Sequence, residues 1–184
     1  MGVGYDLIND INARGTFMLT KEVLPHMEAS GGGHVITMGP PIDLRMLPGK
    51  VGYCISKFSM TLVALGVAAE YQGKGIAGNA LWPATMVESY ATINFGMGDK
   101  SMWRKPSILS DAVMEIIQTP PNELTGRALI DEDFLRERGW KDEDFIKYRC
   151  DPNVEPPHLL KGEWNVEAGL ASQGAKLRTP SSKL

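Results

Sequence analysis

The spacing of apolar residues divides the first 130 residues into alternating helices and short strands. Apolar positions recur at helical spacing between about Asp6 and Glu28, and again between about Tyr53 and Tyr71. The short apolar runs bounded by glycine or proline are typical of buried strands. We expect strands over residues 34–38, 74–81 and 127–130, and a further helix over residues 110–118. This alternation predicts an α/β fold built on a parallel sheet.

The same pattern predicts which parts of the chain are buried. The helix from Tyr53 is apolar on most sides, so we expect it to be buried all round. The longest apolar stretch, Met60–Ala69, is too short to cross a bilayer, and we predict no membrane span. From Asp151 onward repeated prolines argue against regular structure. We therefore divide the chain into a folded part, residues 1–150, and an irregular tail, residues 151–184.

Composition and charge narrow the function classes. The chain has 184 residues, of which 43% are hydrophobic and 22% charged, as in a single globular domain. A net charge of -3 argues against an electrostatic hold on DNA or RNA. Cys54, Cys150 and the three histidines lack the spacing of a ligand set, so we predict no metal site. We interpret Trp103, Arg104, Lys105 and the acidic stretch 131–144 as solvated loop and helix surfaces.

The last three residues carry a targeting signal. Ser182, Lys183 and Leu184 form the tripeptide that the peroxisomal import receptor reads at a C-terminus. The preceding residues are small and polar, which leaves the tripeptide accessible. We predict peroxisomal localisation, with a chance hydrophilic tail as the alternative.

Tyr53 and Lys57 form the candidate chemical pair. They are four residues apart, so they share one face of the expected helix. A tyrosine titrates near pH ~10, and a lysine held close to it favours the phenolate. That shift would bring the phenol toward the range of a general acid or base. For the bare pair, however, a structural contact on a surface helix is the preferred interpretation.

The order of motifs around the pair resembles a known family. The segment Asn12-Ala13-Arg14-Gly15 comes first, then the strand HVITM and a Pro-Pro, then the pair, then Asn79-Ala80-Leu81-Trp82-Pro83. This order is similar to the second half of the short-chain dehydrogenase/reductase family, in its hydroxysteroid dehydrogenase-like branch. The resemblance runs from about Asp6 to Glu132. It implies part of a doubly wound, Rossmann-like parallel sheet: the second half only, with its first strand at an unpaired edge.

The resemblance also implies roles for individual residues. Tyr53 would be the general acid/base, and Lys57 would lower its pKa and hydrogen-bond the nicotinamide ribose of NAD or NADP. Asn12 would hold the water that links Lys57 to solvent. The loop that cups the nicotinamide would contain Pro83, Thr85, Val87 and Ser89. The implied reaction interconverts a carbonyl and a secondary alcohol, on an apolar, lipid-like substrate. The family pairs through its two long helices, so we expect a homo-oligomer.

Three departures from the family pattern keep a second interpretation open. Gly39 and Pro40 stand where the family has a substrate-orienting serine, although Thr37 faces the same side one repeat deeper. Losing one such donor typically costs about 10²–10³ in rate. Ala84 also replaces the usual glycine of the nicotinamide loop. Besides a shortened enzyme, the chain is therefore compatible with a non-catalytic, dehydrogenase-like interaction subunit.

The third departure concerns the phosphates of the coenzyme. The sequence contains no glycine-rich turn between a strand and a helix, where a dinucleotide fold binds the pyrophosphate. Gly31-Gly32-Gly33 follows a helix instead, so we predict a simple loop there. Compared with a full doubly wound domain, we expect roughly 100 residues, about three βα units, to be missing.

Overall fold

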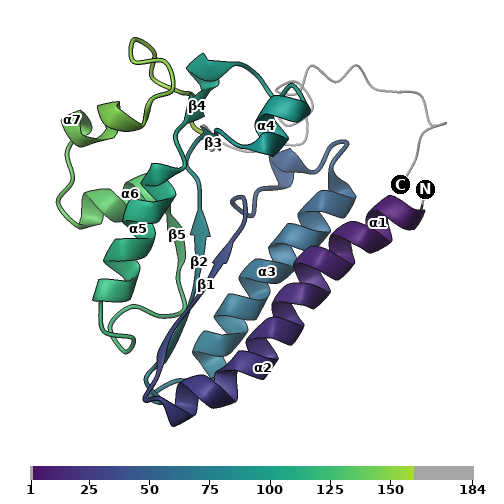
Figure 1. Ribbon diagram of the computed structural model, residues 1–184, viewed down its shortest axis with the longest axis vertical. Helices are drawn as coiled ribbons and strands as arrows, with labels where there is room; N and C mark the ends of the chain where they lie inside the picture. Colours follow the sequence, from purple (N-terminus) through teal and green to yellow (C-terminus); the bar gives the residue numbers. More distant parts are fainter. Residues whose placement is uncertain (1, 160–184) are drawn as a thin grey trace.

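A parallel three-stranded sheet forms the centre of the protein. The computed structural model describes residues 2–159. The strands β1 (Gly33–Met38), β2 (Ile76–Trp82) and β5 (Ala128–Ile130) pair in the order β1-β2-β5, all parallel (Figure 1). This confirms the predicted α/β fold with a parallel sheet. Within the described part of the chain β1 pairs with β2 alone, so it occupies a sheet edge, as expected.

The first predicted helix is one helical run with an internal distortion. It consists of α1 (Gly2–Asn9), a π-helical turn over Asp10–Arg14, and α2 (Gly15–Ala29). The residues at both junctions keep right-handed helical backbone angles, so the chain does not break there. The run ends at the turn before β1, and Gly31–Gly33 form a loop with positive φ angles, as predicted.

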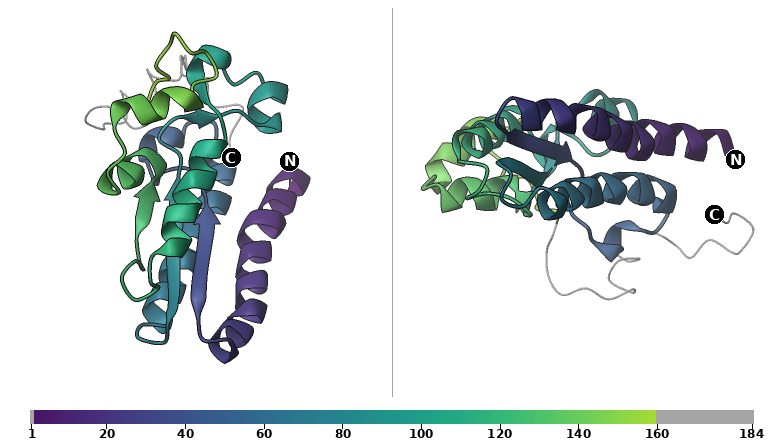
Figure 2. Two further views of the ribbon diagram at one scale, coloured as in Figure 1. Left: turned by 60° about the vertical axis from the view of Figure 1, so that its left-hand side comes forward. Right: turned by 90° about the horizontal axis from the view of Figure 1, so that it is seen from below.

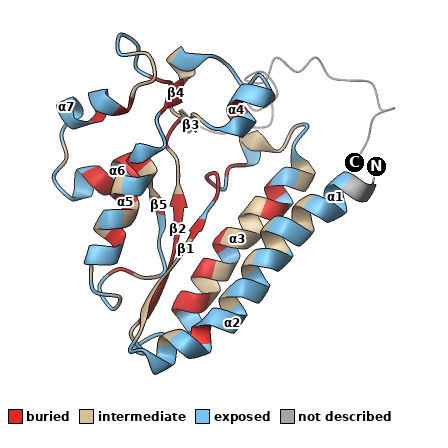
Figure 3. Ribbon diagram, in the orientation of Figure 1, coloured by how far each residue is buried: buried red, intermediate tan, exposed pale blue. Residues whose placement is uncertain are grey.

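The second long helix, α3 (Val51–Glu70), lies against the sheet and against the first helix. A Cβ added at Gly78 in β2 would lie 2.0 Å from the Ala64 carbonyl oxygen, so glycine is what allows α3 to approach the strand this closely. The prediction that this helix is buried all round is wrong. Leu62 is 64% exposed and Ile55 is 46% exposed, because two sides of the helix are covered and the third is open (Figure 3).

The length of α3 changes the reason given for predicting no membrane span. Its apolar part is longer than the predicted stretch of ten residues. Among the described helices, this one is long and apolar enough to cross a membrane, with a mean hydropathy of 1.5 over its best window. A third of that window is buried inside the protein. A core helix that covers a sheet passes the same test, and α3 has this packing; the absence of a membrane span stays a prediction.

The opposite face of the sheet carries the larger apolar core. Here α5 (Ser107–Gln118) packs on β1 and β2, and α6 (Asp131–Glu137) packs on α5 (Figure 2). Alternate residues of β1 divide between the two faces: Val35 packs on the α2 and α3 side, and Ile36 on the α5 side. The buried members of the larger core are Leu81, Ile108, Ala112, Ile116, Leu124, Leu129, Phe134, Leu135, Phe145 and Tyr148.

Several short elements above the sheet were not predicted. The segment after β2 forms β3 (Met86–Val87) and α4 (Tyr90–Asn94), and β3 pairs in parallel with β4 (Trp103–Arg104). Further short elements are α7 (Asp142–Phe145) and 3-10 turns at 44–46, 100–102 and 146–148. Each is shorter than the window over which an apolar period can be read.

The interpretation of the charged segments as solvated surface is partly wrong. Trp103 is 6% exposed and Arg104 is 1% exposed, while Lys105 is exposed as expected. In the acidic stretch, Asp131 and Glu132 are buried. These polar side chains are inside because they pair with one another, which a residue-by-residue interpretation of polarity does not include.

The start of the predicted tail packs on the folded part. Residues 151–159 follow turns and bends, and His158 forms an isolated antiparallel bridge with Thr85. The rest of the predicted tail, including Ser182, Lys183 and Leu184, lies outside the described residues.

Candidate active site

The π-helical turn places Asn12 against α3. One extra residue per turn shifts the helix face at Asp10–Arg14, and the Asn12 amide donates a hydrogen bond to Ser56 Oγ over 3.1 Å. Ser56 is fully buried, and its hydroxyl in turn donates to the Tyr53 carbonyl oxygen over 2.8 Å. Such π-turns occur frequently at functional sites. The three predicted catalytic residues therefore come from two adjacent helices that a side-chain hydrogen bond joins.

Tyr53 and Lys57 lie in the first two turns of α3, beside the carboxyl end of β1. The Lys57 ammonium donates to the Met38 carbonyl oxygen over 3.5 Å and lies 3.7 Å from the Met60 sulfur. Tyr53 is 37% exposed, so the phenol is accessible from outside. The structure thus brings both side chains to the edge of the sheet where parallel α/β folds bind ligands.

The pKa values of the pair differ from the sequence-based expectation. Burial raises the pKa of the Tyr53 phenol above its ordinary value, and the neighbouring Cys54 adds to the rise. Burial also lowers the pKa of the Lys57 ammonium. In this structure the Lys57 ammonium donates to a backbone carbonyl oxygen, and the expected lowering of the Tyr53 pKa by Lys57 stays a prediction for the coenzyme-bound protein. The catalytic roles of Tyr53, Lys57 and Asn12 stay predictions.

The end of β1 has room for the missing hydroxyl. A Cβ added at Gly39 would lie 3.4 Å from the Lys57 carbonyl oxygen and 3.9 Å from Thr61 Oγ1, which are ordinary contacts. Two residues earlier, Thr37 is 5% exposed, and its hydroxyl has no hydrogen-bond partner among the described residues. An unpaired buried hydroxyl is costly in a folded protein. Among the buried side-chain hydroxyls of residues 2–159, that of Thr37 is left without a partner.

The predicted nicotinamide loop, residues 83–89, follows β2 directly, and its hydroxyl side chains are already bonded within the protein. Thr85 is 1% exposed, and its hydroxyl donates to the Met86 carbonyl oxygen over 3.1 Å. Ser89 caps α4: its Oγ accepts the Thr92 N–H over 3.2 Å. Pro83 precedes the loop and Val87 lies in β3. The coenzyme-binding role of Pro83, Thr85, Val87 and Ser89 stays a prediction.

Two buried carboxylates next to this loop, Asp131 and Glu132, were not predicted as functional residues from the sequence. Asp131, 1% exposed, accepts the backbone N–H of Ala84 over 2.8 Å and that of Glu132 over 2.6 Å. Burial raises the pKa of Asp131 to about 6, although the two N–H groups and Arg104 act to lower it.

Glu132 is stabilised in its charged form by two arginines, and a histidine lies beside it. It contacts the buried Arg104, binds Arg136 over 2.8 Å and lies 3.1 Å from His158 Nε2. Burial acts to raise the pKa of Glu132, but the hydrogen bonds and charges of Arg136 and Arg104 outweigh it and lower the pKa. The sequence does hold a signal for this acidic pair. Both carboxylates come directly after an apolar strand, where side chains reach the ligand-binding edge of a parallel sheet.

Comparisons with known proteins agree with this geometry. The short chain dehydrogenase family model matches residues 5–94. Over 158 residues, 84% of the chain, it is 38% identical to hydroxysteroid dehydrogenase-like protein 2 of Xenopus laevis. The chain belongs to the short-chain dehydrogenase family. The relative of the same name from Homo sapiens is 34% identical, which supports the predicted hydroxysteroid dehydrogenase-like branch.

Solved structures show the extent of the shared fold. A putative dehydrogenase from Xanthomonas campestris superposes with a TM-score of 0.75 at 33% identity, over 86% of this chain and 59% of that one. A short-chain dehydrogenase from Mycobacterium thermoresistibile gives a TM-score of 0.71 at 37% identity, over 84% of this chain and 55% of that one. The chain spans about a third of the length of the Xenopus laevis and Homo sapiens relatives.

Proposed function

We propose that the chain forms the proton-handling end of an NAD(P)-dependent oxidoreductase that interconverts a carbonyl group and a secondary alcohol. Tyr53 exchanges the proton with the substrate oxygen, Lys57 stabilises the phenolate and hydrogen-bonds the nicotinamide ribose, and Asn12 holds the water that links Lys57 to solvent. The observation that carries this proposal is the position of the Lys57 ammonium, 3.5 Å from the Met38 carbonyl oxygen at the carboxyl end of β1, one helical turn from Tyr53.

The residues at this edge suit the nicotinamide end of the coenzyme. Short-chain dehydrogenases generally use NAD or NADP, and the bound coenzyme supplies the hydride donor or acceptor. Lys57 offers a donor for the ribose, and the unpaired Thr37 hydroxyl adds a second polar group at the same strand end. Loop 83–89 lies next to them, where β2 ends.

The glycine cluster of this chain does not suit the diphosphate. Gly31–Gly33 lie at the amino end of β1, the opposite end of the strand from Tyr53 and Lys57 (Figure 1). The Gly33 N–H donates to the Gly75 carbonyl oxygen over 2.9 Å, and a Cβ at Gly32 would lie 2.0 Å from that oxygen. These glycines allow two turns to pack closely, and we assign them no phosphate.

The proposed substrate is apolar and lipid-like. Support comes from α4, which follows loop 83–89 and exposes large apolar side chains. Tyr90 is 86% exposed, Ile93 55% and Phe95 80%. We propose that these apolar side chains, which follow loop 83–89, contact a substrate bound near Tyr53.

Coenzyme binding tests the proposal directly. Titration of the purified full chain with NADH and NADPH, followed by nucleotide fluorescence, is expected to show saturable binding. Lys57→Met removes a charged donor, so we expect affinity to fall roughly tenfold or more. Lys50→Met is the matched control, since Lys50 is exposed at the start of the same helix. Absence of binding by the unmodified chain would overturn the proposal.

A non-catalytic interaction subunit is the second candidate function. Gly39 supplies no hydroxyl to a substrate, and α2 and α3 expose an apolar surface that suits association. This candidate predicts that the chain binds neither NADH nor NADPH, yet forms a stable complex with another dehydrogenase-like chain. The fluorescence titration together with co-purification therefore separates the two functions.

We also propose that the chain forms a homo-oligomer through α2 and α3. A groove of about 430 Å³ lies between these helices, lined by Phe17, Leu24, Leu62 and Val67 among others. Large apolar side chains remain exposed around it: Leu7, Ile11, Phe17, Leu19 and Leu62. Sedimentation is expected to give a dimer or larger species, and Leu62→Glu is expected to dissociate it.

The peroxisomal destination is proposed on the tripeptide Ser182-Lys183-Leu184 alone. A fluorescent protein fused to the N-terminus is expected to accumulate in peroxisomes. Deleting Leu184 is expected to leave the fusion outside them. Peroxisomal accumulation without Leu184 would contradict the assignment.

A further inference from the structure

Loop 83–89 is held from inside the fold by a residue with no assigned role. Asp131 Oδ1 accepts the backbone N–H of Ala84 over 2.8 Å. Asp131 follows β5 directly, and β5 pairs with β2 so that Ile130 lies beside Trp82. The pairing of these two strands therefore places the carboxylate where the loop leaves the sheet.

The same loop is held from outside by the segment 149–159. The Leu159 N–H donates to the Ala84 carbonyl oxygen over 2.7 Å, and His158 bridges to Thr85. Both backbone polar groups of Ala84 are thus bound by residues far away in the sequence. This leaves the peptide groups on either side of Ala84 little freedom to rotate.

The outer segment is itself anchored by buried charge. Arg104 in β4 is 1% exposed, contacts Glu132, and binds Glu155 over 2.5 Å. Glu155 also pairs with Arg149 over 2.5 Å. Displacing the segment would leave the Arg104 charge buried with fewer partners, which is strongly unfavourable. The segment 149–159 is therefore fixed over the loop.

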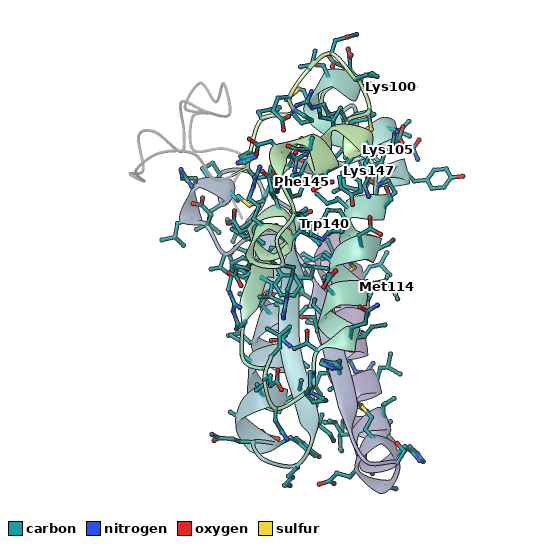
Figure 4. The ribbon with its side chains drawn as sticks, turned by 90° about the vertical axis from the view of Figure 1, so that its left-hand side faces the viewer. Lys100, Lys105, Met114, Trp140, Phe145 and Lys147 are labelled. Carbon is teal, nitrogen blue, oxygen red and sulfur yellow. The ribbon has the colours of Figure 1, made fainter. Side chains whose placement is uncertain are left out.

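An aromatic cluster packs beside this anchor. The Arg104 guanidinium lies 5.7 Å from the centre of the Phe145 ring, and Phe145 lies 6.2 Å from Trp140. Figure 4 shows Phe145, Trp140 and Lys147 gathered at the α7 end of the protein. The Lys147 ammonium lies 4.6 Å from the Trp140 ring. The Arg104–Glu132 pair is buried on both sides, which strengthens it, whereas Glu155 is half exposed.

We propose that Asp131 is a positioning residue for loop 83–89, and that Asp131 and the segment 149–159 together form a clamp on Ala84. The clamp sets the direction in which residues 85–89 leave the sheet, toward β3 and the cap of α4. That this loop contacts the nicotinamide rests on the proposed function. The hold of the clamp on the loop is independent of the proposed function.

Residue-resolved amide hydrogen exchange of the full chain tests the clamp. Asp131→Ala removes a charged acceptor, so we expect the Ala84 amide to exchange roughly 10- to 100-fold faster, with smaller increases up to Val87. Leu159→Pro removes the other donor and is expected to raise exchange over the same stretch. Asp133→Ala is the matched control, because Asp133 is an exposed carboxylate on the same turn of α6.

The pattern of exchange separates positioning from general destabilisation. Faster exchange confined to residues 84–87, with unchanged protection in α3 and α5, supports the clamp. Ala84 exchange within twofold of the unmodified protein overturns it. Equal acceleration in the loop, α3 and α5 also overturns it, because Asp131 would then act on the whole fold.

Binding and kinetic measurements with NADPH on the same variants test separately whether loop 83–89 contacts the coenzyme. We expect Asp131→Ala to raise the KM for NADPH more than it lowers kcat, because the loop, and not Tyr53, is disturbed. A loosened loop with unchanged NADPH affinity would leave the clamp standing and remove loop 83–89 from the coenzyme site. A chain that binds no NADPH would sink the proposed function, while the exchange data would still decide on the clamp.

Discussion

At the carboxyl end of β1 the Tyr53 phenol is 37% exposed, and the Lys57 ammonium reaches a backbone carbonyl oxygen. At the carboxyl end of β5, one strand beyond β2, Asp131 and Arg104 are each 1% exposed and bonded to several partners. The two ends belong to one sheet and lie on the same edge (Figure 1). The first end leaves its titratable side chains partly open to solvent, whereas the second buries its charged side chains among several partners.

The difference shows what each region needs. In the proposed proton transfer the pKa of Tyr53 has to respond to coenzyme and substrate, and in the structure the Lys57 ammonium donates to a backbone carbonyl oxygen. A positioning group is held by its contacts, and Asp131 and Arg104 are buried and hydrogen-bonded. Variants of Tyr53 are expected to change chemistry with little effect on stability, whereas breaking the buried Arg104–Glu132 pair is expected to lower stability.

The largest effect is expected from Tyr53→Phe. Removing the phenolic hydroxyl deletes the proton donor and should lower kcat by about 10²–10⁴. The ring stays, so the melting temperature should not change. The rate of NADPH oxidation with a panel of apolar carbonyl compounds gives kcat, and calorimetry gives the melting temperature. Tyr90→Phe serves as the control, since Tyr90 is 86% exposed; full activity in Tyr53→Phe would erase the contrast between the two ends.

Arg104→Ala should have the largest effect on stability. It leaves Glu132 buried without one of its cations, which we expect to cost about 3 kcal/mol in the free energy of unfolding. Arg127→Ala breaks the exposed pair with Glu137 and should cost less than about 1 kcal/mol. Urea unfolding of both variants measures the difference. Equal costs would show that burial does not distinguish the two pairs.

Asp131 should give the protein an unusual pH dependence. Its folded-state pKa of about 6 lies above the ordinary 3.8, so between these values the folded protein binds more protons than the unfolded chain. Its contribution to stability is therefore greatest below pH ~4 and falls as pH rises to ~6, by about 3 kcal/mol for roughly two units. The Arg104 charge and the backbone N–H groups of Ala84 and Glu132 partly oppose this rise in pKa, whereas the Glu132 charge adds to it.

The difference between unmodified protein and Asp131→Asn isolates this effect. Plotted against pH, the difference in unfolding free energy should slope between about pH 4 and 6 and be flat above it. Asp133→Asn, which removes an exposed carboxylate from the same helix, is the control variant. A flat curve for Asp131→Asn would mean that the carboxyl titrates normally, and the contrast with the solvent-open end would weaken.

Gly39→Ser should give a smaller gain of function. The space at Gly39 accepts a Cβ at ordinary contact distances, so the variant is expected to fold and to add a hydroxyl donor at the end of β1. One oriented donor would raise kcat by up to about 10². Gly66→Ser adds a hydroxyl in open space elsewhere on α3 and should change nothing. No gain in Gly39→Ser would place the substrate oxygen away from the end of β1.

The local parts of this protein were predictable from its sequence. Apolar spacing identified the long helices and the strands of the sheet, because each depends on residues close together in the sequence. Their alternation then predicted a parallel sheet. The spacing of Tyr53 and Lys57 predicted a shared helix face for the same reason. The π-turn at Asn12 was not predicted, since one extra residue in a helical turn hardly disturbs an apolar period.

The burial of charge was decided by tertiary structure. Arg104 lies 28 residues from Glu132 in the sequence, and Asp131 lies 47 from Ala84. Neither pairing leaves a local pattern, so both segments resembled solvated surface. The exposure of Leu62 and Ile55 was likewise invisible, because a helix apolar on all sides does not reveal which side the sheet covers.

The sequence by itself determined which elements form and which residues could carry a proton, because backbone periodicity and side-chain chemistry are local properties. Only the folded chain decided which charges are buried and which stay open to solvent. That choice depends on whether a partner from a distant segment offsets the cost of removing a charge from water.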